Sequence, residues 1–492
     1  MGDASTSSPW RDQHGGGSQS LRPIDQVQYH GRASHKDVVM VAPVGHAQAV
    51  EQQFEPRLDS DRLSDTLSAL VRRHQIPGAQ LAIHHGGETV AVEVGELQYG
   101  TGRPVTRDAA VPIGSITKTF TATLAMILVA DGDLELDTPL GEHVPELGDL
   151  GNELTLRQVL SHTGGLAVEP GSEEVFTAIR RYVLDHHFRR QNLVLPPGTG
   201  FSYSNMGYVL VGHLIETITG MSWWDAMESM LLRPLGIEPT FVGAPGRRPL
   251  GRPLATGHSV NTAVGRTRPV EQSLAPAAAP AAGLAVSAVD LVTLGLTQLG
   301  GTPALLPTAY AEQMRQAVST VEPFGSVDGW GLGLAVFGSG STAWVGHSGG
   351  QDGTDCHVRL DPLSGCVVAY TSNAYTGGMW WYELVDELRR AGLPIRDGAN
   401  TESLERPMAP PPGCVGSYLN GKSELLVEVT DTGALSLAGI DGVGKELILF
   451  EDLSFSIREK PSIRGRFLRD PITGDVELIQ ADLWTYRRQS RK

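Results

Sequence analysis

Two short stretches of the sequence place a serine where it could form an acyl-enzyme. Residues 114–118 read GSITK, with a lysine three residues after a serine, so both side chains would share one face of a helical turn and the lysine could act as the base. Residues 346–350 read GHSGG, the Gly-x-Ser-x-Gly pattern of a nucleophile elbow. Either Ser115 or Ser348 could attack an acyl carbonyl, and the elements around each serine decide between them.

The surroundings of Ser348 do not favour an elbow. A nucleophile elbow has a strand before the serine and a helix after it. A strand is expected before Ser348, but the residues after Gly350, QDGTDCHVRLDPLSG, predict a turn and another strand. The acid and the histidine of an elbow hydrolase also come from separate later loops, and only His357 follows this serine, nine residues on. We therefore expect the side chain of Ser348 to point away from the reaction.

Lysine usage favours Ser115. Lysines make up six of the 39 basic residues, and Lys118 is the only one between Lys36 and Lys422. Arginine cannot release its proton in a protein, whereas a desolvated lysine can, and can then act as a base. An N-cap serine followed by a solvated lysine is the alternative. The rarity of lysine indicates that chemistry, and not charge, requires it at position 118.

Two further motifs follow along the chain. Residues 201–205, FSYSN, contain Tyr203 and Asn205 in a Tyr-x-Asn pattern, and residues 347–349, HSG, form a basic-x-Gly triplet on an edge-like strand. In this order, Ser-x-x-Lys, Tyr-x-Asn and Lys/His-x-Gly resemble the penicillin-binding-protein and class C β-lactamase superfamily of serine hydrolases. The resemblance covers about residues 62–393 and includes the segments LTLRQVLSHTGGL and PPGTGFSYSNMGYVLVGHLIE.

The resemblance implies roles for the motif residues. Ser115 would attack an acyl carbonyl and become the acyl-enzyme, while Lys118 and Tyr203 would handle its proton. Which of these two is the base stays open, because Tyr203 could accept the proton only with a lowered pKa or beside a neutral lysine. His347 would assist Tyr203 in proton transfer.

The same resemblance assigns the binding groups. The backbone N–H groups of Ser115 and Gly350 would form the oxyanion hole. Asn205 would orient Lys118 or hold a substrate amide. His162, in LSHTGG, is interpreted as a structural turn residue. No cofactor is expected, and no Cys/His spacing suggests a metal.

Position 347 is where this chain departs from the β-lactamases, which have lysine there. A lysine suits a substrate carboxylate, whereas histidine is mostly neutral at pH 7. The resemblance then implies a serine hydrolase or acyltransferase acting on an ester, an amide or a peptidyl substrate, including D-configured ones. The alternatives are a peptide-cyclising thioesterase acting on a carrier-protein-bound thioester, a β-lactamase, or a catalytically inactive binding protein.

Composition excludes several partners. With 55 acidic and 39 basic residues the net charge is −16, which argues against nucleic-acid binding. No signal-peptide pattern and no apolar run of about 18 residues is found, so we expect a cytoplasmic protein without a membrane partner, acting on a small-molecule or peptide substrate. The three cysteines are too few for a disulfide framework and are predicted to be buried free thiols.

Hydrophobic periodicity predicts an α+β fold, an antiparallel sheet flanked by helices with a helical subdomain inserted. A helix and a hairpin over residues 62–97 come first, strands follow from residue 330, and the first and last strands of the sheet are expected to meet. We divide the chain into a disordered segment 1–55, a catalytic domain 56–398, a Pro-rich linker 399–412 and a small antiparallel β-barrel 413–492 that resembles a lipocalin-like domain. Helices are predicted over residues 116–129, 208–219, 224–232, 288–298 and 382–391.

Overall fold

The computed structural model describes residues 59–169, 187–243, 251–318, 323–376, 379–398, 406–411, 413–439, 442–469 and 473–489. The segment 1–55, predicted to be disordered, lies outside these residues, as do residues 399–405 of the predicted linker. Within the described residues no helix is long and apolar enough to cross a membrane.

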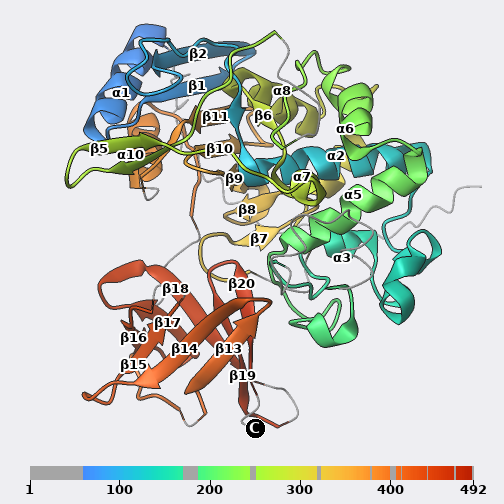
Figure 1. Cartoon of the computed structure of the whole chain (residues 1–492), viewed down its shortest axis with the longest axis vertical. Helices are drawn as coiled ribbons and strands as arrows, with labels where there is room; N and C mark the ends of the chain where they lie inside the picture. The colour runs from blue at the N-terminus through green and yellow to red at the C-terminus, as the bar shows by residue number, and fades with distance from the viewer. Residues whose placement is uncertain are drawn as a thin grey trace, which may run out of the picture. The chain divides into compact units, whose positions relative to one another are not determined.

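A seven-stranded antiparallel sheet lies at the centre of the catalytic part (Figure 1). Its strand order is β2-β1-β11-β10-β9-β8-β7, so the first hairpin pairs with the last long strand, as the sequence predicts. The strands are β1 (Gly78–His85), β2 (Glu88–Gly95), β7 (Gly329–Trp330), β8 (Ala335–Phe337), β9 (Trp344–Gly349), β10 (Asp355–Leu360) and β11 (Val367–Ser372).

Helices cover both faces of this sheet. On one face α1 packs on β1 and β2 and against α10, whose Trp380 and Trp381 contact β11 and β10, and on the other α8 packs on β1, β10 and β11. The bounds are α1 (Ser60–Arg73), α2 (Thr117–Asp131), α3 (Leu156–Leu160), α5 (Asn205–Thr219), α6 (Trp223–Ala226), α7 (Ala279–Ala282), α8 (Ala288–Gln298), α9 (Thr308–Arg315) and α10 (Met379–Arg390).

Helix α2 carries the Ser-x-x-Lys motif at its start and is buried on all sides. Every residue from Thr117 to Leu128 is buried, and α2 packs against α5 and α7 (Figure 1). Its mostly apolar sequence, TKTFTATLAMILVAD, suits this position, because a helix that is hydrophobic all round belongs in a core. Gly132, in the left-handed conformation with φ 83°, ends the helix.

Most predicted elements are confirmed with shifted ends. Helix α8 has the predicted bounds, whereas α5 begins at Asn205 instead of residue 208, because the Ser204 hydroxyl accepts a hydrogen bond from the Gly207 N–H and caps the helix. Short strands missed from the sequence complete the catalytic part: β3 (Val111–Pro112) with β6 (Ala285–Val286), and β4 (His258–Asn261) with β5 (Arg266–Pro269) and β12 (Ala374–Tyr375).

The C-terminal part is a closed eight-stranded antiparallel barrel, which confirms the predicted architecture. Apolar alternation after the linker predicts the six strands β14 to β19 but neither the first strand, β13, nor the last, β20, which pair with each other to close the barrel. The strands are β13 (Gly416–Asn420), β14 (Ser423–Val429), β15 (Leu435–Ala438), β16 (Lys445–Leu449), β17 (Ser454–Ile457), β18 (Lys460–Arg469), β19 (Val476–Ala481) and β20 (Trp484–Arg488).

The cysteines behave as predicted. Cys356, Cys366 and Cys414 are free and buried, the first on β10, the second just before β11 and the third just before the barrel. They contribute small apolar volume to the cores.

Candidate active site

Ser115 lies in a single 3-10 turn, Gly114–Ile116, that leads directly into α2. Two cavities meet at this serine. The larger, of about 630 Å³, also touches Tyr203 and His347, and the smaller, of about 300 Å³, also touches Asn205. The predicted nucleophile is therefore reachable from two sides.

Lys118 is fully buried and points at the serine. Its Nζ donates hydrogen bonds to Ser115 Oγ at 3.1 Å and to the carbonyl oxygen of Ala281, on α7, at 3.0 Å. Burial lowers the pKa of Lys118 from 10.5 to about 7, while the charge of Glu169 acts in the opposite direction. A large fraction of the lysine is therefore neutral, and able to accept a proton, at pH 7.

Tyr203 lies on the other side of the serine. Its hydroxyl hydrogen-bonds with Ser115, and the Lys118 Nζ lies 5.0 Å from the centre of its ring. Burial raises the pKa of Tyr203 well above its ordinary value, and the bond to Ser115 only partly offsets this. The phenol is therefore protonated, so it can donate a hydrogen bond but is a poor proton acceptor.

His347 lies on β9 with its ring buried. Its Nδ1–H donates to the carbonyl oxygen of Ser348 at 2.6 Å, which leaves the Nε2 lone pair free of hydrogen bonds within the described part of the chain. Burial, with Lys118 adding to it, lowers the pKa of His347 to about 3. The ring is neutral at any working pH, as expected for histidine at this position.

The strand end around His347 is open on one side. Strand β8 pairs only with residues 344–346 of β9, whereas β10 pairs with β9 as far as Gly349. Although β9 is an inner strand of the sheet, its catalytic end is therefore edge-like, as predicted, and its last residues are accessible to a substrate.

Glycines let two backbone segments meet beside the serine. A Cβ added to Gly349 would lie 2.8 Å from the backbone N of Ser115, and one added to Gly114, where φ is 49°, would lie 2.3 Å from the carbonyl oxygen of Gly350. Side chains at these positions would force the segments apart. The structure thus brings together the two segments predicted to form the oxyanion hole.

Asn205 is the first residue of α5, where its N–H donates to the carbonyl oxygen of Val168. With Ser115 it lines the smaller cavity, a position suited to holding a substrate amide. The partner that orients Lys118 from the far side is the Ala281 carbonyl. A backbone carbonyl leaves no trace in the sequence pattern, so this contact was missed.

The side chain of Ser348 binds two residues of β10, His357 and Arg359, and its orientation away from the reaction stays a prediction. Its side chain lines the larger cavity, its Oγ hydrogen-bonds with His357 Nδ1 at 2.9 Å, and it accepts a bond from Arg359 Nη2 at 2.9 Å. The β9–β10 hairpin places His357 directly opposite Ser348, so nine residues of separation are enough for contact. A strand and not a helix follows the turn, so the elbow itself is absent, as predicted.

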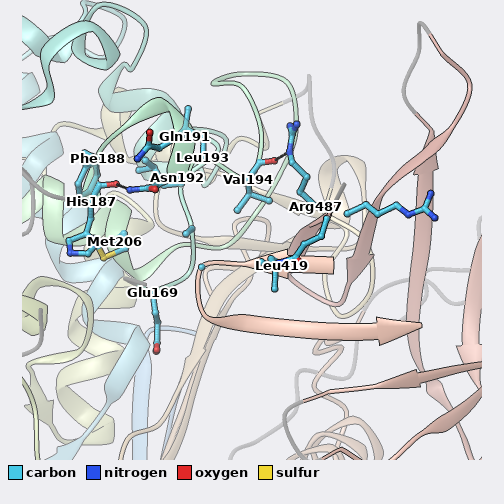
Figure 2. A pocket seen from close by; sticks show the side chains of 15 residues that line it. Glu169, His187, Phe188, Gln191, Asn192, Leu193, Val194, Met206, Leu419 and Arg487 are labelled. Atoms are coloured by element: carbon cyan, nitrogen blue, oxygen red, sulfur yellow. Dashed lines mark hydrogen bonds between the residues drawn. The ribbon is translucent and has the colours of Figure 1, made fainter. Parts of the chain in front are cut away.

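A third cavity, of about 600 Å³, lies between the loop 187–194 and the barrel strands β13 and β20 (Figure 2). Glu169 lines both this cavity and the smaller cavity at Ser115. In Figure 2 its side chain extends away from the loop that carries Gln191 and Leu193. Glu169 belongs to none of the motifs that the sequence predicts to form the site.

Comparisons with known proteins agree with this geometry. A sequence model of the family described as Beta-lactamase matches residues 63–379. Penicillin-binding protein 4 of Amycolatopsis lactamdurans is 30% identical over 346 residues, which are 67% of this chain and 89% of that protein.

Solved structures extend the similarity. The crystal structure of SurE shares 39% sequence identity with this chain at a TM-score of 0.79, and the match covers 87% of this chain and 99% of SurE. A second SurE structure contains D-Leu. D-amino acid amidase from Ochrobactrum anthropi, solved with L-phenylalanine amide, has 26% identity and a TM-score of 0.57 over 68% of this chain and 98% of its own. The chain therefore belongs to the penicillin-binding-protein and β-lactamase family of serine hydrolases.

Proposed function

We propose that the protein is a serine hydrolase or acyltransferase that forms an acyl-enzyme on Ser115 and acts on an ester, amide or peptidyl substrate whose acyl residue is D-configured. The observation that carries the proposal is the buried Ser115–Lys118–Tyr203 cluster at the junction of two cavities. Each proton transfer that acylation needs has a group within hydrogen-bond reach.

In this proposal Lys118 is the base. Its lowered pKa of about 7 lets the neutral amine accept the Ser115 proton over 3.1 Å, whereas the pKa of Tyr203 is raised by burial. Ser115 Oγ then attacks the acyl carbonyl, and the carbonyl oxygen receives hydrogen bonds from the N–H groups of Ser115 and Gly350.

The second half of the step needs a proton for the leaving group. The Tyr203 hydroxyl supplies it, and Lys118, now an ammonium, returns a proton to the tyrosine. His347, whose Nε2 is a neutral acceptor, assists this exchange from the side of the larger cavity. Water or an amine entering by the same route would then release the acyl group, with the protons moving in reverse.

The two cavities divide the substrate in this scheme. Tyr203 and His347 touch the larger cavity, so the leaving group and the incoming acceptor belong there. Asn205 and a wall of small side chains line the smaller cavity, whose volume of about 300 Å³ suits one acyl residue of moderate size. The Asn205 amide would hold the amide oxygen of a peptidyl group.

Two relatives support a D-configured acyl residue. One SurE structure contains D-Leu, and the amidase from Ochrobactrum anthropi is named for D-amino acids. The neutral ring of His347 supplies no cation for a substrate carboxylate, so we expect slow turnover of β-lactams.

Two measurements test the proposal. The first treats the full chain with a fluorophosphonate and maps the adduct by peptide mass, with Ser115→Ala as the control; the adduct is expected on Ser115. The second compares D-leucyl and L-leucyl esters of one alcohol and expects kcat/KM to be at least about 100-fold higher for the D form, a discrimination of about 3 kcal/mol.

The outcomes are separable. An adduct on Ser348 would remove Ser115 as the nucleophile, and the absence of any adduct would favour an inactive binding protein. If Ser115 is labelled and the D and L esters react at equal rates, Ser115 remains the nucleophile and the proposed preference for a D-configured acyl residue is refuted.

A further inference from the structure

We propose that the C-terminal barrel is a working part of the active site: through Asn420, Leu483 and Thr485 it positions Tyr203 for proton transfer at Ser115. This inference rests on the proposed function and adds to it. It gives the barrel, which carries no catalytic grouping of its own, a role in the chemistry.

Residues 201–204 form the loop that carries Tyr203, here called the Tyr203 loop. Three consecutive backbone N–H groups of this loop donate hydrogen bonds, two to the catalytic part and one to the barrel. The N–H of Ser202 donates to the His162 carbonyl oxygen at 3.0 Å, and that of Ser204 donates to His162 Nδ1 at 3.0 Å. Between them, the N–H of Tyr203 donates to the carbonyl oxygen of Leu483, in the β19–β20 turn of the barrel, at 2.9 Å. The catalytic part thus fixes the residues on either side, and the barrel fixes Tyr203 itself.

Asn420, at the end of β13, joins three segments. Its Nδ2 donates to Ser202 Oγ at 3.1 Å and to the carbonyl oxygen of Thr485 at 2.9 Å, while its Oδ1 accepts from the Val168 N–H at 2.8 Å. The side chain is completely buried. A buried amide with its donors and its acceptor all in use specifies one arrangement of the groups around it.

Thr485 closes the same contact from β20. Its Oγ1 donates to the Phe201 carbonyl oxygen at 2.6 Å, and its N–H donates to Ser202 Oγ at 3.3 Å. Its neighbour Trp484 packs edge-on against the Tyr203 ring, with 6.5 Å between ring centres. Hydrogen bonds from the barrel therefore reach each of the residues 201–203.

His162 completes the support from the catalytic part. Its ring lies against the Tyr203 ring, with 4.2 Å between centres, and it adopts φ 60°, an uncommon conformation for a residue other than glycine. The sequence LSHTGG predicts a structural turn at His162. In the structure the turn aims both its carbonyl and its ring nitrogen at the Tyr203 loop.

A second contact joins the barrel to the loop before Tyr203. Arg487 of β20 donates from Nε to the Val194 carbonyl oxygen at 2.8 Å (Figure 2). Polar contacts between packed domains are common, so contact by itself does not distinguish positioning from simple docking. The distinguishing property is that the barrel should act on the rate only through Tyr203.

The test uses the full chain with Thr485→Val and Asn420→Asp, which weaken the hydrogen bonds between the barrel and the Tyr203 loop and are called the clamp variants. Tyr418→Phe is the matched control, because it removes one buried hydrogen bond, Tyr418 Oη to the Cys414 carbonyl, from within the barrel itself. The rate of Ser115 labelling by a fluorophosphonate is measured alone and in a Tyr203→Phe background. We expect Thr485→Val to slow labelling about 10-fold and Tyr418→Phe to slow it less than about twofold. In the Tyr203→Phe background, where the hydroxyl is absent, Thr485→Val should have almost no effect on the rate.

Labelling of each clamp variant at the wild-type rate would overturn the inference, and so would an equal loss with and without the Tyr203 hydroxyl. Hydrogen exchange gives a readout that does not depend on activity. The amides of residues 202–204 are expected to exchange faster in Thr485→Val than in Tyr418→Phe. If the wild type labels no serine at all, the proposed function fails, and unchanged exchange in Thr485→Val would then refute the clamp separately.

Discussion

Replacing Lys118 by methionine should inactivate the protein and also make it more stable at neutral pH. Methionine has nearly the same length but no charge, and Lys118 is completely buried in a mostly apolar helix. If the lysine is kept for its proton chemistry, the folded state bears the cost of burying an ammonium. Removing the ammonium should remove that cost along with the activity.

The size of the effect follows from the pKa. Because burial lowers the pKa of Lys118 from 10.5 to about 7, the unfolded chain binds the proton more tightly than the folded one between these values. The resulting destabilisation is about 5 kcal/mol below pH 7, about 4 kcal/mol at pH 7, and is lost as the pH rises toward 10.5. Methionine leaves the Ala281 carbonyl unpaired, which costs about 1–3 kcal/mol. The net gain is about 2 kcal/mol at pH 7.

Urea unfolding of both proteins from pH 6 to 10 measures this difference. The midpoint of Lys118→Met should be higher than that of the wild type at pH 7, and the two curves should cross as the pH approaches 10. Lys445→Met, at an exposed lysine of the barrel, is the control and should change stability by less than about 0.5 kcal/mol at every pH. If Lys118→Met is less stable than the wild type at pH 7, the conclusion that burial of Lys118 destabilises the folded protein is refuted.

Three further outcomes are expected. Ser348→Ala should still be labelled on Ser115 by a fluorophosphonate, at a rate reduced far less than the about 100-fold expected on losing a proton-transferring group. In a pH–rate profile of His347→Gln, the residual kcat/KM should still fall below pH 7 with a midpoint near 7. The reason is that the titrating base is Lys118, whose pKa is about 7, whereas the pKa of His347 is already lowered to about 3. Arg359→Leu should lower the free energy of unfolding by about 3–5 kcal/mol in urea, since it leaves a buried carboxylate partner unpaired.

The sequence could predict the parts of the site that depend on side-chain type and local spacing. Ser-x-x-Lys at the start of an apolar helix requires the two side chains to share a helical face, and the 3.1 Å contact follows from that spacing. The alternating strands after residue 330 predicted a sheet, and the family resemblance predicted the pairing of the Ser115 and Gly350 segments that the structure brings together. In each case a few adjacent residues determine the outcome.

Contacts between distant segments could not be predicted in the same way. Leu483 holds Tyr203 through a backbone carbonyl 280 positions away, and any residue type could supply that carbonyl. Strands β13 and β20 were missed because their apolar alternation is interrupted by polar residues such as Asn420 and Thr485. Those buried polar residues carry the contact with the Tyr203 loop. The same polar residues therefore interrupt the strand pattern in the sequence and join the barrel to the site in the structure.

The histidine at position 347 fits the electrostatics around Lys118. Lys118, His162 and His347 surround the Tyr203 phenol, and burial lowers the pKa of all three, with the charge of Lys118 lowering the pKa of both histidines further. A lysine at position 347 would add a second ammonium to this dry cluster. Lys118 and His347, as neutral bases beside one protonated phenol, can pass a proton without leaving a permanent charge beside the substrate. Such a site selects an acyl group by shape and hydrogen bonds, and not by a carboxylate, which is why we expect uncharged acyl donors to be the better substrates.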